Sequence, residues 1–346
     1  MKAVRLYEGP EVRVEDVLEP EVGPGQIRVA VEAAGLCGTD LHAARGHLPV
    51  PGLPVIMGHE GAGIVEAVGA GVSEFGAGDR VLILPSETCG NCPACQDGHL
   101  GLCPAARIFG MARDGTFAEK IAVPASCALP LPDGIAFEHG AILADAVATA
   151  YHAVATRAGI TGGERIAVLG CGGVGHHAIL LARLLGAKTI VAADASPGSL
   201  RRAEEAGADA TVDVSSGNAR KAIREAAGGG GPDLVIEYVG KKASVELAMA
   251  SVARGGRVIV GGVGMESPAL GPLVSFVGRE IGVLGSMGYT RAELDRVVEL
   301  TATGRLDLSG SITARYPLDR AAEALDDLEN RRNDPVRLAL LPGASS

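Results

Sequence analysis

The pattern of apolar and polar positions changes character about 150 residues into the chain. In the first part, short apolar runs are punctuated by Gly and Pro, as in residues 26–35, 61–69 and 79–85. Runs of this kind are typical of the short strands of an antiparallel β domain. We therefore predict a β-rich domain over residues 1–150.

After Arg165, strand-like apolar runs alternate with longer helical segments. The strand-like runs are 166–170, 189–194, 233–240 and 257–262, and the helical segments are 176–187, 199–208 and 244–253. Repeated strand–helix crossovers predict a parallel, doubly wound sheet. From about Leu284 we expect a strand, a helix from Thr290 to about Thr303, and a short tail that returns to the first domain. The prediction is an α/β protein with one domain of residues 1–150 and 287–346 and a second of residues 151–286.

Length and charge narrow the class of protein. The 346 residues exceed what one hydrophobic core usually organises, which favours two domains. A net charge of −10 without any basic run argues against a nucleic-acid partner. Every apolar stretch is interrupted before it reaches membrane-spanning length, and the first residues lack an apolar signal core. We expect a cytoplasmic protein with no membrane partner.

A glycine-rich motif follows the first strand of the predicted parallel sheet and opens an apolar helix. It consists of Gly170, Cys171, Gly172, Gly173, Val174 and Gly175. Glycines allow close approach of the backbone to a pyrophosphate, and the helix N-terminus offers free N–H groups. Asp194 ends the next strand, where a carboxylate accepts ribose hydroxyls and repels a 2′-phosphate. The motif predicts NAD rather than NADP; the alternative is a turn that merely packs strand on helix.

Four cysteines are crowded into one short segment: Cys89, Cys92, Cys95 and Cys103. Four thiolates at this spacing can surround one tetrahedral zinc ion. Because the protein fills all four positions, we predict a structural zinc site. The alternative is a redox or disulfide cluster.

A second set of potential metal ligands is spread more widely along the chain. Cys37 and His59 can supply a sulfur and a nitrogen, and a catalytic zinc generally has three protein ligands. Asp145 is the candidate third ligand because it is the one carboxylate in a long apolar run. Its alternative role is to cap the helix that follows, and Glu60 is then the replacement ligand.

These residues resemble the zinc-containing alcohol dehydrogenases of the medium-chain dehydrogenase/reductase family over essentially the whole chain. The stretch GHEGAGIVEAVGAGV is similar to the zinc signature of the family, and the four-cysteine segment has the family spacing. The stretch CGTDLHAARGHLPVPGLPVIMGHEG resembles the short-loop bacterial and yeast-like branch. The resemblance implies a GroES-like catalytic domain and a Rossmann domain, two zinc ions per chain, NAD, and a homotetramer or homodimer.

The resemblance also implies roles for individual residues. Cys37, His59 and Asp145 match the catalytic zinc ligands, although many members have a cysteine in place of Asp145, and Glu60 matches a residue that transiently contacts the metal. Thr39 and His42 match a proton relay. The implied reaction is reversible hydride transfer between an alcohol and NAD. Arg291 matches a position that approaches the cofactor pyrophosphate, or is an exposed residue at a helix start.

The position of Leu48 bears on substrate size. In the branch that this segment resembles, an indole commonly narrows the pocket there, whereas this chain contains no Trp. Other residues expected near the pocket are Leu84, Pro85, Phe109 and Met287. We expect secondary alcohols, or alcohols larger than ethanol, as substrates, unless Leu48 serves core packing.

Two other functions compete with this interpretation. The same fold hosts polyol and threonine (amino-alcohol) dehydrogenases, which typically have Glu at the position of Asp145, and zinc-free enone reductases, which lack both metal motifs. A non-catalytic NAD or redox sensor would need no proton relay, so Thr39 and His42 argue against it.

Overall fold

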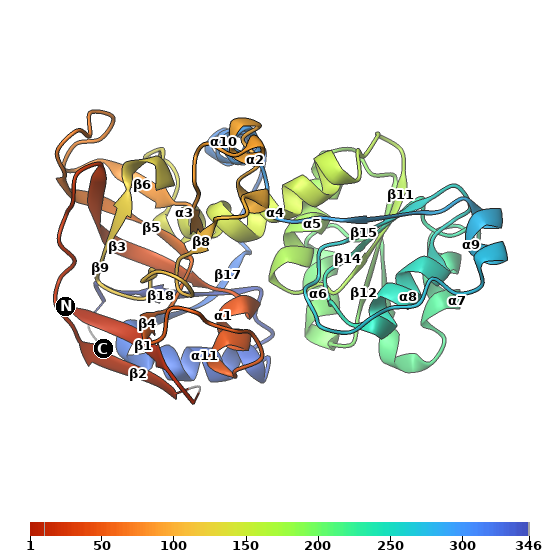
Figure 1. Cartoon of the computed structure of the whole chain (residues 1–346). Helices are drawn as coiled ribbons and strands as arrows, with labels where there is room; N and C mark the ends of the chain where they lie inside the picture. The colour runs from red at the N-terminus through yellow and green to blue at the C-terminus, as the bar shows by residue number, and fades with distance from the viewer. Residues whose placement is uncertain (10, 345–346) are drawn as a thin grey trace. The chain divides into compact units, whose positions relative to one another are not determined.

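The computed structural model describes residues 1–9 and 11–344. The chain divides into two compact units, Met1–Ala146 with Thr290–Ser346, and Val147–Tyr289. Figure 1 labels their helices and strands.

The first unit is built mainly of antiparallel sheet. Its largest sheet has the order β10-β6-β5-β3-β18-β17, with β9 also paired to β3. A smaller sheet has the order β2-β1-β4, and β7 pairs with β8. The strands are β1 (Lys2–Tyr7), β2 (Glu11–Asp16), β3 (Gln26–Leu36), β4 (Val55–Ile56), β5 (Glu60–Val68), β6 (Arg80–Ile83), β7 (Ser86–Glu87), β8 (Arg107–Ile108), β9 (Lys120–Pro124), β10 (Ala128–Pro130), β17 (Ile312–Pro317) and β18 (Arg337–Leu341).

The helices of the first unit are short and connect or flank these strands. They are α1 (Gly38–Ala44), α2 (Pro93–Gln96), α3 (Phe137–Ile142), α10 (Arg291–Ala302) and α11 (Ala321–Glu329). The helix α10 begins where the sequence predicts, because Thr290 and Glu293 form a reciprocal capping box. After it, β17 and β18 pair in parallel, and β18 pairs antiparallel with β3. The C-terminal tail therefore extends the sheet that begins near the N-terminus.

The second unit is a parallel, doubly wound sheet, as the sequence predicts. Its strand order is β13-β12-β11-β14-β15-β16, and all five pairings are parallel. The strands are β11 (Arg165–Leu169), β12 (Thr189–Asp194), β13 (Ala210–Asp213), β14 (Leu234–Glu237), β15 (Arg257–Val260) and β16 (Gly282–Gly285). The helices are α4 (Ala148–Tyr151), α5 (Gly173–Leu184), α6 (Pro197–Glu205), α7 (Ala219–Ala226), α8 (Lys242–Ser251) and α9 (Leu273–Arg279).

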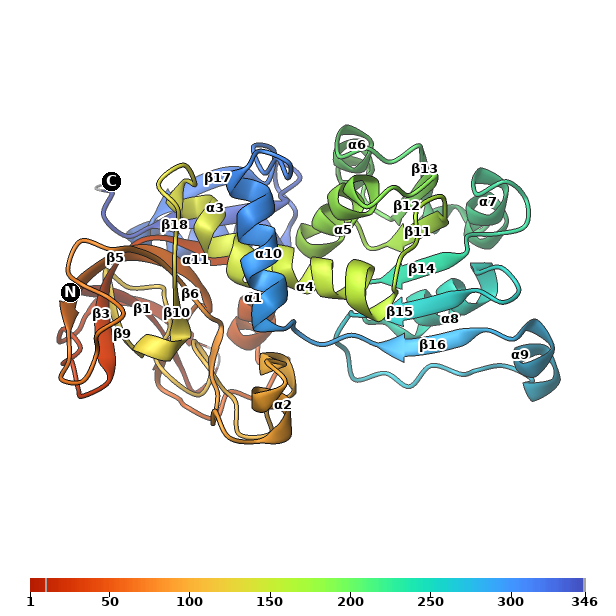
Figure 2. The ribbon, with the colours of Figure 1, turned by 90° about the horizontal axis from the view of Figure 1, so that it is seen from above.

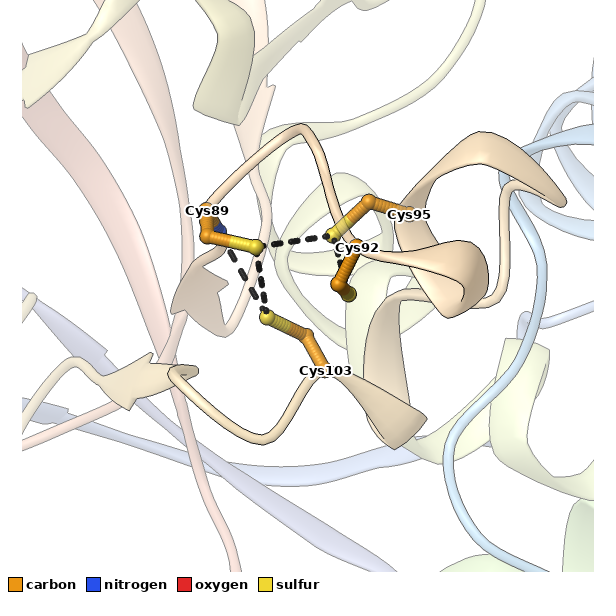
Figure 3. Close-up of side chains that lie close together, drawn as sticks. All are labelled: Cys89, Cys92, Cys95 and Cys103. Atoms are coloured by element: carbon orange, nitrogen blue, oxygen red, sulfur yellow. Dashed lines mark hydrogen bonds between the residues drawn. The ribbon is translucent and has the colours of Figure 1, made fainter.

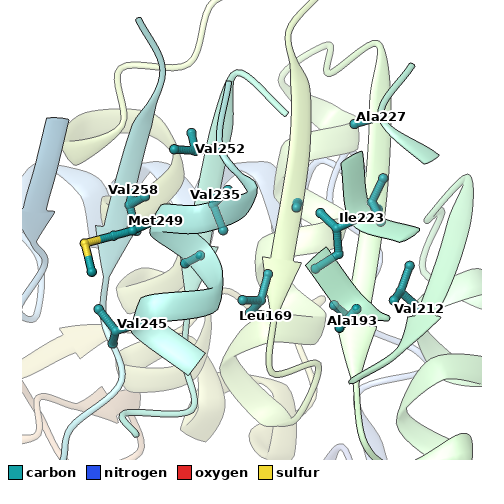
Figure 4. Close-up of a cluster of buried hydrophobic side chains, with 14 of the residues drawn as sticks. Leu169, Ala193, Val212, Ile223, Ala227, Val235, Val245, Met249, Val252 and Val258 are labelled. Carbon is teal, nitrogen blue, oxygen red and sulfur yellow. The ribbon is translucent and has the colours of Figure 1, made fainter. Parts of the chain in front are cut away.

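A buried apolar cluster joins this sheet to the helices α7 and α8. Leu169, Val235 and Val258 contribute from three neighbouring strands, and Ile223 and Met249 contribute from the two helices. Figure 4 shows these side chains between the strands and the helices. Burial of such side chains is the main favourable term in folding. The cluster includes Leu169, the last residue of β11, which directly precedes the glycine motif.

Candidate active site and metal centres

The four cysteines of the predicted structural site converge in a lobe of the first unit. Cys92 is the residue directly before the short helix α2, and Cys95 lies within this helix. Cys89 precedes the helix in the chain, and Cys103 follows it. The Sγ–Sγ distances are 3.9 Å for Cys89–Cys95, 3.5 Å for Cys92–Cys95 and 3.6 Å for Cys89–Cys103 (Figure 3). A tetrahedral zinc ion with Zn–S bonds of 2.3 Å separates its sulfurs by about 3.8 Å. The donor set and its spacing therefore fit zinc, and all four thiols are free of disulfides.

A second cluster brings together Cys37, His59, Glu60 and Asp145, whose donor atoms all lie within 4.8 Å of one another. Cys37 follows β3 and caps α1, and His59 and Glu60 stand at the start of β5. Since β3 and β5 are paired, with Gly35 opposite Glu60, the sheet brings these residues together. Gly35 leaves room for the Glu60 side chain, since a Cβ atom there would lie 2.1 Å from Glu60 Oε2.

Asp145 reaches this cluster from a π-helical segment, Leu143–Val147, which joins α3 to α4. It lies inside continuous helical backbone, so it does not cap a helix start, and the capping alternative is wrong. Single π-turns within helices are frequent at functional sites. Asp145 lies in this π-helical turn, and its carboxylate points towards Cys37 and His59.

The geometry of Cys37, His59 and Asp145 fits a zinc site. Asp145 Oδ2 lies 3.6 Å from Cys37 Sγ and 3.7 Å from His59 Nε2. With usual bond lengths, tetrahedral zinc separates a sulfur or nitrogen ligand from an oxygen ligand by about 3.3–3.6 Å. Burial opposes ionisation of Asp145 and Cys37, but His59 and Arg337 lower the pKa of the carboxyl, and Arg337 lowers that of the thiol. The surroundings favour the anionic forms that bind metal.

Asp40 is a site residue that sequence reasoning missed. It is 4% exposed, and its Oδ1 lies 3.1 Å from His59 Nδ1 while its Oδ2 accepts the Cys37 N–H at 2.9 Å. Holding Nδ1 directs the opposite ring nitrogen, Nε2, at the cluster. One carboxylate thus orients both a sulfur and a nitrogen donor. The signal was present in the sequence, because Asp40 follows Cys37 at a capping-box spacing.

Arg337 is the second residue that sequence reasoning missed. It is 3% exposed on β18, its guanidinium lies 2.9 Å from Glu60 Oε1 and 3.6 Å from Asp145 Oδ2, and it donates to the Leu36 carbonyl at 3.1 Å. Burial raises the pKa of Glu60 well above its usual range, although Arg337 opposes this effect. A buried positive charge balances the surplus of acidic donors. No local pattern in the sequence marks this arginine.

The glycine motif of the second unit has the backbone that phosphate binding requires. Gly170 has φ +86°, and a Cβ atom on it would lie 2.8 Å from Val239, while a Cβ on Gly175 would lie 1.9 Å from the Gly170 carbonyl. Gly172 is the N-cap of α5, which starts with Gly173, Val174 and Gly175. The motif therefore forms a tight turn directly into a helix N-terminus, where N–H groups lack intrahelical partners.

Asp194 lies beside this turn. Its carboxylate is 5% exposed, and it accepts the backbone N–H of Cys171 and that of Ser196, each at 2.8 Å. The carboxylate is thus fixed between the glycine turn and the start of α6.

The remaining predicted residues lie in several places. Thr39 and His42 are on α1, with Thr39 Oγ1 3.7 Å from Cys37 Sγ and the His42 side chain exposed. Arg291 starts α10, and its side chain lies 3.5 Å from Asp295. Leu48 is partly exposed.

The other predicted pocket residues have different surroundings within their own units. Leu84 and Phe109 are buried, and the Phe109 N–H donates to the Pro85 carbonyl at 3.0 Å. Met287 is 53% exposed and belongs to the second unit.

Comparisons with known proteins identify the family of the chain. Residues 23–133 match the alcohol dehydrogenase GroES-like domain, and residues 173–303 match the zinc-binding dehydrogenase family. The chain is 31% identical to sorbitol dehydrogenase of Bacillus subtilis, over 99% of this chain and 97% of that protein. It is 34% identical to an alcohol dehydrogenase of Geobacillus stearothermophilus, over 94% of this chain and 95% of that one. The chain belongs to the zinc-containing alcohol dehydrogenase family.

Solved structures of this family have the same fold. The alcohol dehydrogenase TADH from Thermus sp. ATN1 matches with a TM-score of 0.91 at 32% identity, covering 99% of both chains. An NAD-dependent alcohol dehydrogenase matches with a TM-score of 0.90 at 33% identity, covering 99% of this chain and 100% of that one.

The described part of the chain has no helix long and apolar enough to cross a membrane.

Proposed function

We propose that this protein is a zinc-dependent alcohol dehydrogenase that transfers hydride reversibly between an alcohol and NAD. The observation that supports the proposal most strongly is the buried set of Cys37, His59 and Asp145, at ligand spacing, in a chain of this family. In our proposal the first unit is the catalytic domain and the second binds the dinucleotide. Zinc would supply a Lewis acid that lowers the pKa of the substrate hydroxyl, and NAD would supply the hydride acceptor.

The residues of the chain divide the remaining work. Cys37, His59 and Asp145 would hold the metal, with Asp40 fixing the first two of them. Thr39 would accept the proton of the alcohol hydroxyl while its own proton moves towards His42. His42 lies on the same helix and is exposed, so it can release the proton to solvent.

Glu60 would serve as a replacement metal ligand, and Arg337 would hold it beside the three resting ligands. The buried Glu60 carboxylate is 2.9 Å from the guanidinium, and its side chain stands within ligand distance of the cluster. It can replace a ligand when coordination changes during turnover. Arg337 would hold Glu60 back from the metal in the resting state.

The glycine turn and Asp194 would bind the adenosine half of NAD. The N-terminus of α5 would face the pyrophosphate, and Asp194 would accept the ribose hydroxyls. A 2′-phosphate would meet the negative charge of a buried, fixed carboxylate. Arg291 would approach the pyrophosphate, although its pairing with Asp295 is equally consistent with a surface role.

The proposed substrate is a secondary alcohol, or one larger than ethanol. The support is Leu48, which leaves more room than an indole. The second candidate is a polyol or amino alcohol, which the similarity to a sorbitol dehydrogenase favours. Rates of NADH formation across primary, secondary, cyclic, aromatic and polyhydroxy alcohols distinguish the two.

A Leu48→Trp variant tests the pocket directly. We expect it to lower kcat/KM for a bulky secondary alcohol at least tenfold, about 1.4 kcal/mol, while ethanol is spared. An equal loss for all substrates would show that Leu48 does not shape the pocket. Preference of the unaltered enzyme for ethanol over every larger alcohol would also contradict the proposal.

We propose a homodimer, or a tetramer made of two such dimers, assembled through the edge of the parallel sheet. β16 is the last strand in the sheet order (Figure 2), and all four of its residues are exposed. The neighbouring segment is rich in exposed apolar side chains: Val263 70%, Met265 90%, Leu273 68%, Val274 82% and Val277 72% exposed. An unpaired apolar edge is a template for another strand. A two-fold axis would pair β16 with its own copy in antiparallel register.

We place the protein in the cytoplasm, since its cysteines are free thiols and four of them form a metal-binding lobe.

A further inference from the structure

Four arginines of the second unit gather at the C-terminal end of α8. Arg220 and Arg224 come from α7, Arg254 from the turn after α8, and Arg279 from the end of α9. Arg220 donates to the Ala250 carbonyl at 3.2 Å, Arg224 to Ser251 and Val252 at 3.0 and 3.2 Å, and Arg279 to Met249 at 2.9 Å. Arg254 donates to the Gly278 carbonyl at 2.7 Å.

The charge of this cluster is not balanced by acidic side chains. Across residues 1–9 and 11–344, none of the four guanidinium groups forms an ion pair with a carboxylate; their hydrogen bonds go to carbonyl oxygens. The C-terminus of α8 offsets only about half an elementary charge. Burial, followed by repulsion from Arg224, Arg220 and Arg254, lowers the pKa of Arg279. The four guanidinium groups therefore carry an excess of positive charge, which a bound anion would neutralise.

A cavity of about 420 Å³ opens on two of these arginines, Arg220 and Arg279. Its walls are otherwise mainly apolar, with Met249, Leu270, Phe276 and Ile281, and Ser275 adds a hydroxyl. Glu246 also lines it, but this carboxylate already accepts the Ala269 N–H at 2.9 Å and lies 4.0 Å from the Lys242 ammonium. The cavity combines a cationic end with an apolar body.

The cavity is separate from the other sites on this unit. On α9, Ser275, Phe276 and Arg279 share one helix face and line it, whereas Leu273, Val274 and Val277 belong to the exposed apolar surface. The C-terminus of α8 precedes β15 and therefore lies at the amino edge of the parallel sheet. The glycine turn follows β11 and lies at the carboxyl edge.

We propose that this cavity binds a small amphipathic anion, a carboxylate or phosphate monoester carried on an aliphatic or aromatic group. The anionic group would bind Arg220 and Arg279, which present N–H forks suited to carboxylate and phosphate oxygens. The apolar body would lie against Met249, Phe276 and Ile281. The site is additional to the dehydrogenase centre and does not depend on it.

The test is calorimetric titration of the zinc-loaded, full-length protein with octanoate. Octanamide serves as the uncharged isostere and inorganic phosphate as the anion without an apolar body. We expect octanoate to bind at least tenfold more tightly than either. Equal binding of octanamide would remove the role of charge, and equal binding of phosphate would remove the role of the apolar walls.

Variants locate the site. Arg220→Gln should weaken octanoate binding at least tenfold, because it removes an exposed guanidinium that makes one carbonyl contact, so the fold should survive. Lys221→Gln changes the net charge equally on the same helix, outside the cavity, and should leave binding within twofold. Arg220→Lys should restore part of the affinity. Unchanged binding in Arg220→Gln, or equal loss in Lys221→Gln, would overturn the proposal. Alcohol oxidation should be equal in all variants.

Discussion

At the scale of single residues, the site depends on carboxylates with distinct environments. Asp145 is directed at a sulfur and a nitrogen donor, Asp40 is held behind those donors, and Glu60 is paired with a buried arginine. Asp194 is fixed by two backbone N–H groups in the other unit. In our proposal the same chemical group thus serves as metal ligand, as orienting group, as replacement ligand and as cofactor-binding residue.

Asp40→Ala should weaken binding of the catalytic metal and lower kcat/KM about 10- to 100-fold, because the His59 ring and the Cys37 backbone lose the carboxylate that orients them. The measurement is zinc affinity of the purified variant by competition with a chelator, alongside turnover. Asp40→Asn should retain more affinity, since an amide oxygen can still accept one of the two N–H groups. Normal zinc affinity in Asp40→Ala would show that Asp40 has no orienting role.

Asp194→Gly should weaken binding of NAD and relieve the repulsion of the 2′-phosphate of NADP. We expect the ratio of kcat/KM values for NAD and NADP to change by one to three orders of magnitude, or roughly 1.4 to 4 kcal/mol. Steady-state kinetics with both cofactors measure it. An unaltered enzyme that already prefers NADP would contradict our interpretation of this carboxylate.

Residues close together in sequence were the most predictable. The four cysteines and the glycine turn lie within short segments, so their spacing alone indicates a metal lobe and a phosphate turn. Arg337 could not be predicted, since it reaches the cluster only through the pairing of β18 with β3. The choice of Asp145 came from its isolation in an apolar run, but the π-helical turn that directs it has no local signal.

At the scale of elements, the hydrophobic pattern predicted the parallel sheet well. Its central strands β11, β12 and β14 are buried on both faces and read as continuous apolar runs, and α10 carries its own capping signal. The short strands of the first unit were harder, because β4, β7 and β8 have only two residues each. Their existence depends on partners elsewhere in the chain. The exposed apolar face near α9 was not predicted, because a pattern of apolar residues does not reveal which of them stay uncovered.

The cysteine lobe is an element whose fold should depend on metal. Its helix α2 has four residues, none of them buried, so packing alone contributes little. Cys92→Ser should therefore lower the thermal stability of the lobe and increase its cleavage by protease, with hydride transfer affected only secondarily. Limited proteolysis and thermal unfolding measure this. The matched control is Cys127→Ser, which alters a buried cysteine outside the lobe. This variant should keep the zinc content of the lobe unchanged. Unaltered protease resistance in Cys92→Ser would contradict a structural role.

At the scale of the whole molecule, the two units combine different chemistry in one chain. The first gathers two sets of potential metal ligands, and the second holds the glycine turn and Asp194. The sequence predicted both kinds of unit and the family. Substrate and assembly need more than pattern, because they depend on loops and surfaces whose roles are set by what lies against them.

Assembly can be tested through the exposed apolar surface. Val274→Glu places a charge on a side chain that is 82% exposed. We expect it to convert a dimer or tetramer to smaller species in light scattering, with little change in unfolding temperature of the isolated chain, because a partner would otherwise bury that charge. Leu18→Glu, at a side chain 94% exposed in the first unit, is the control and should leave the mass unchanged. A monomeric unaltered protein would contradict the proposed assembly.

The central claim is that turnover depends on a metal held by Cys37, His59 and Asp145, and the most direct measurement follows zinc content and NADH formation together during dialysis against a chelator. The two clusters predict two zinc ions per chain with different lability, because the four-thiolate site would be closed while the other, in our proposal, would use three protein ligands and keep one position open. We predict that one zinc leaves first, that turnover falls in proportion while the fold is kept, and that added zinc restores it. Full turnover in protein shown by elemental analysis to be free of metal would contradict the account.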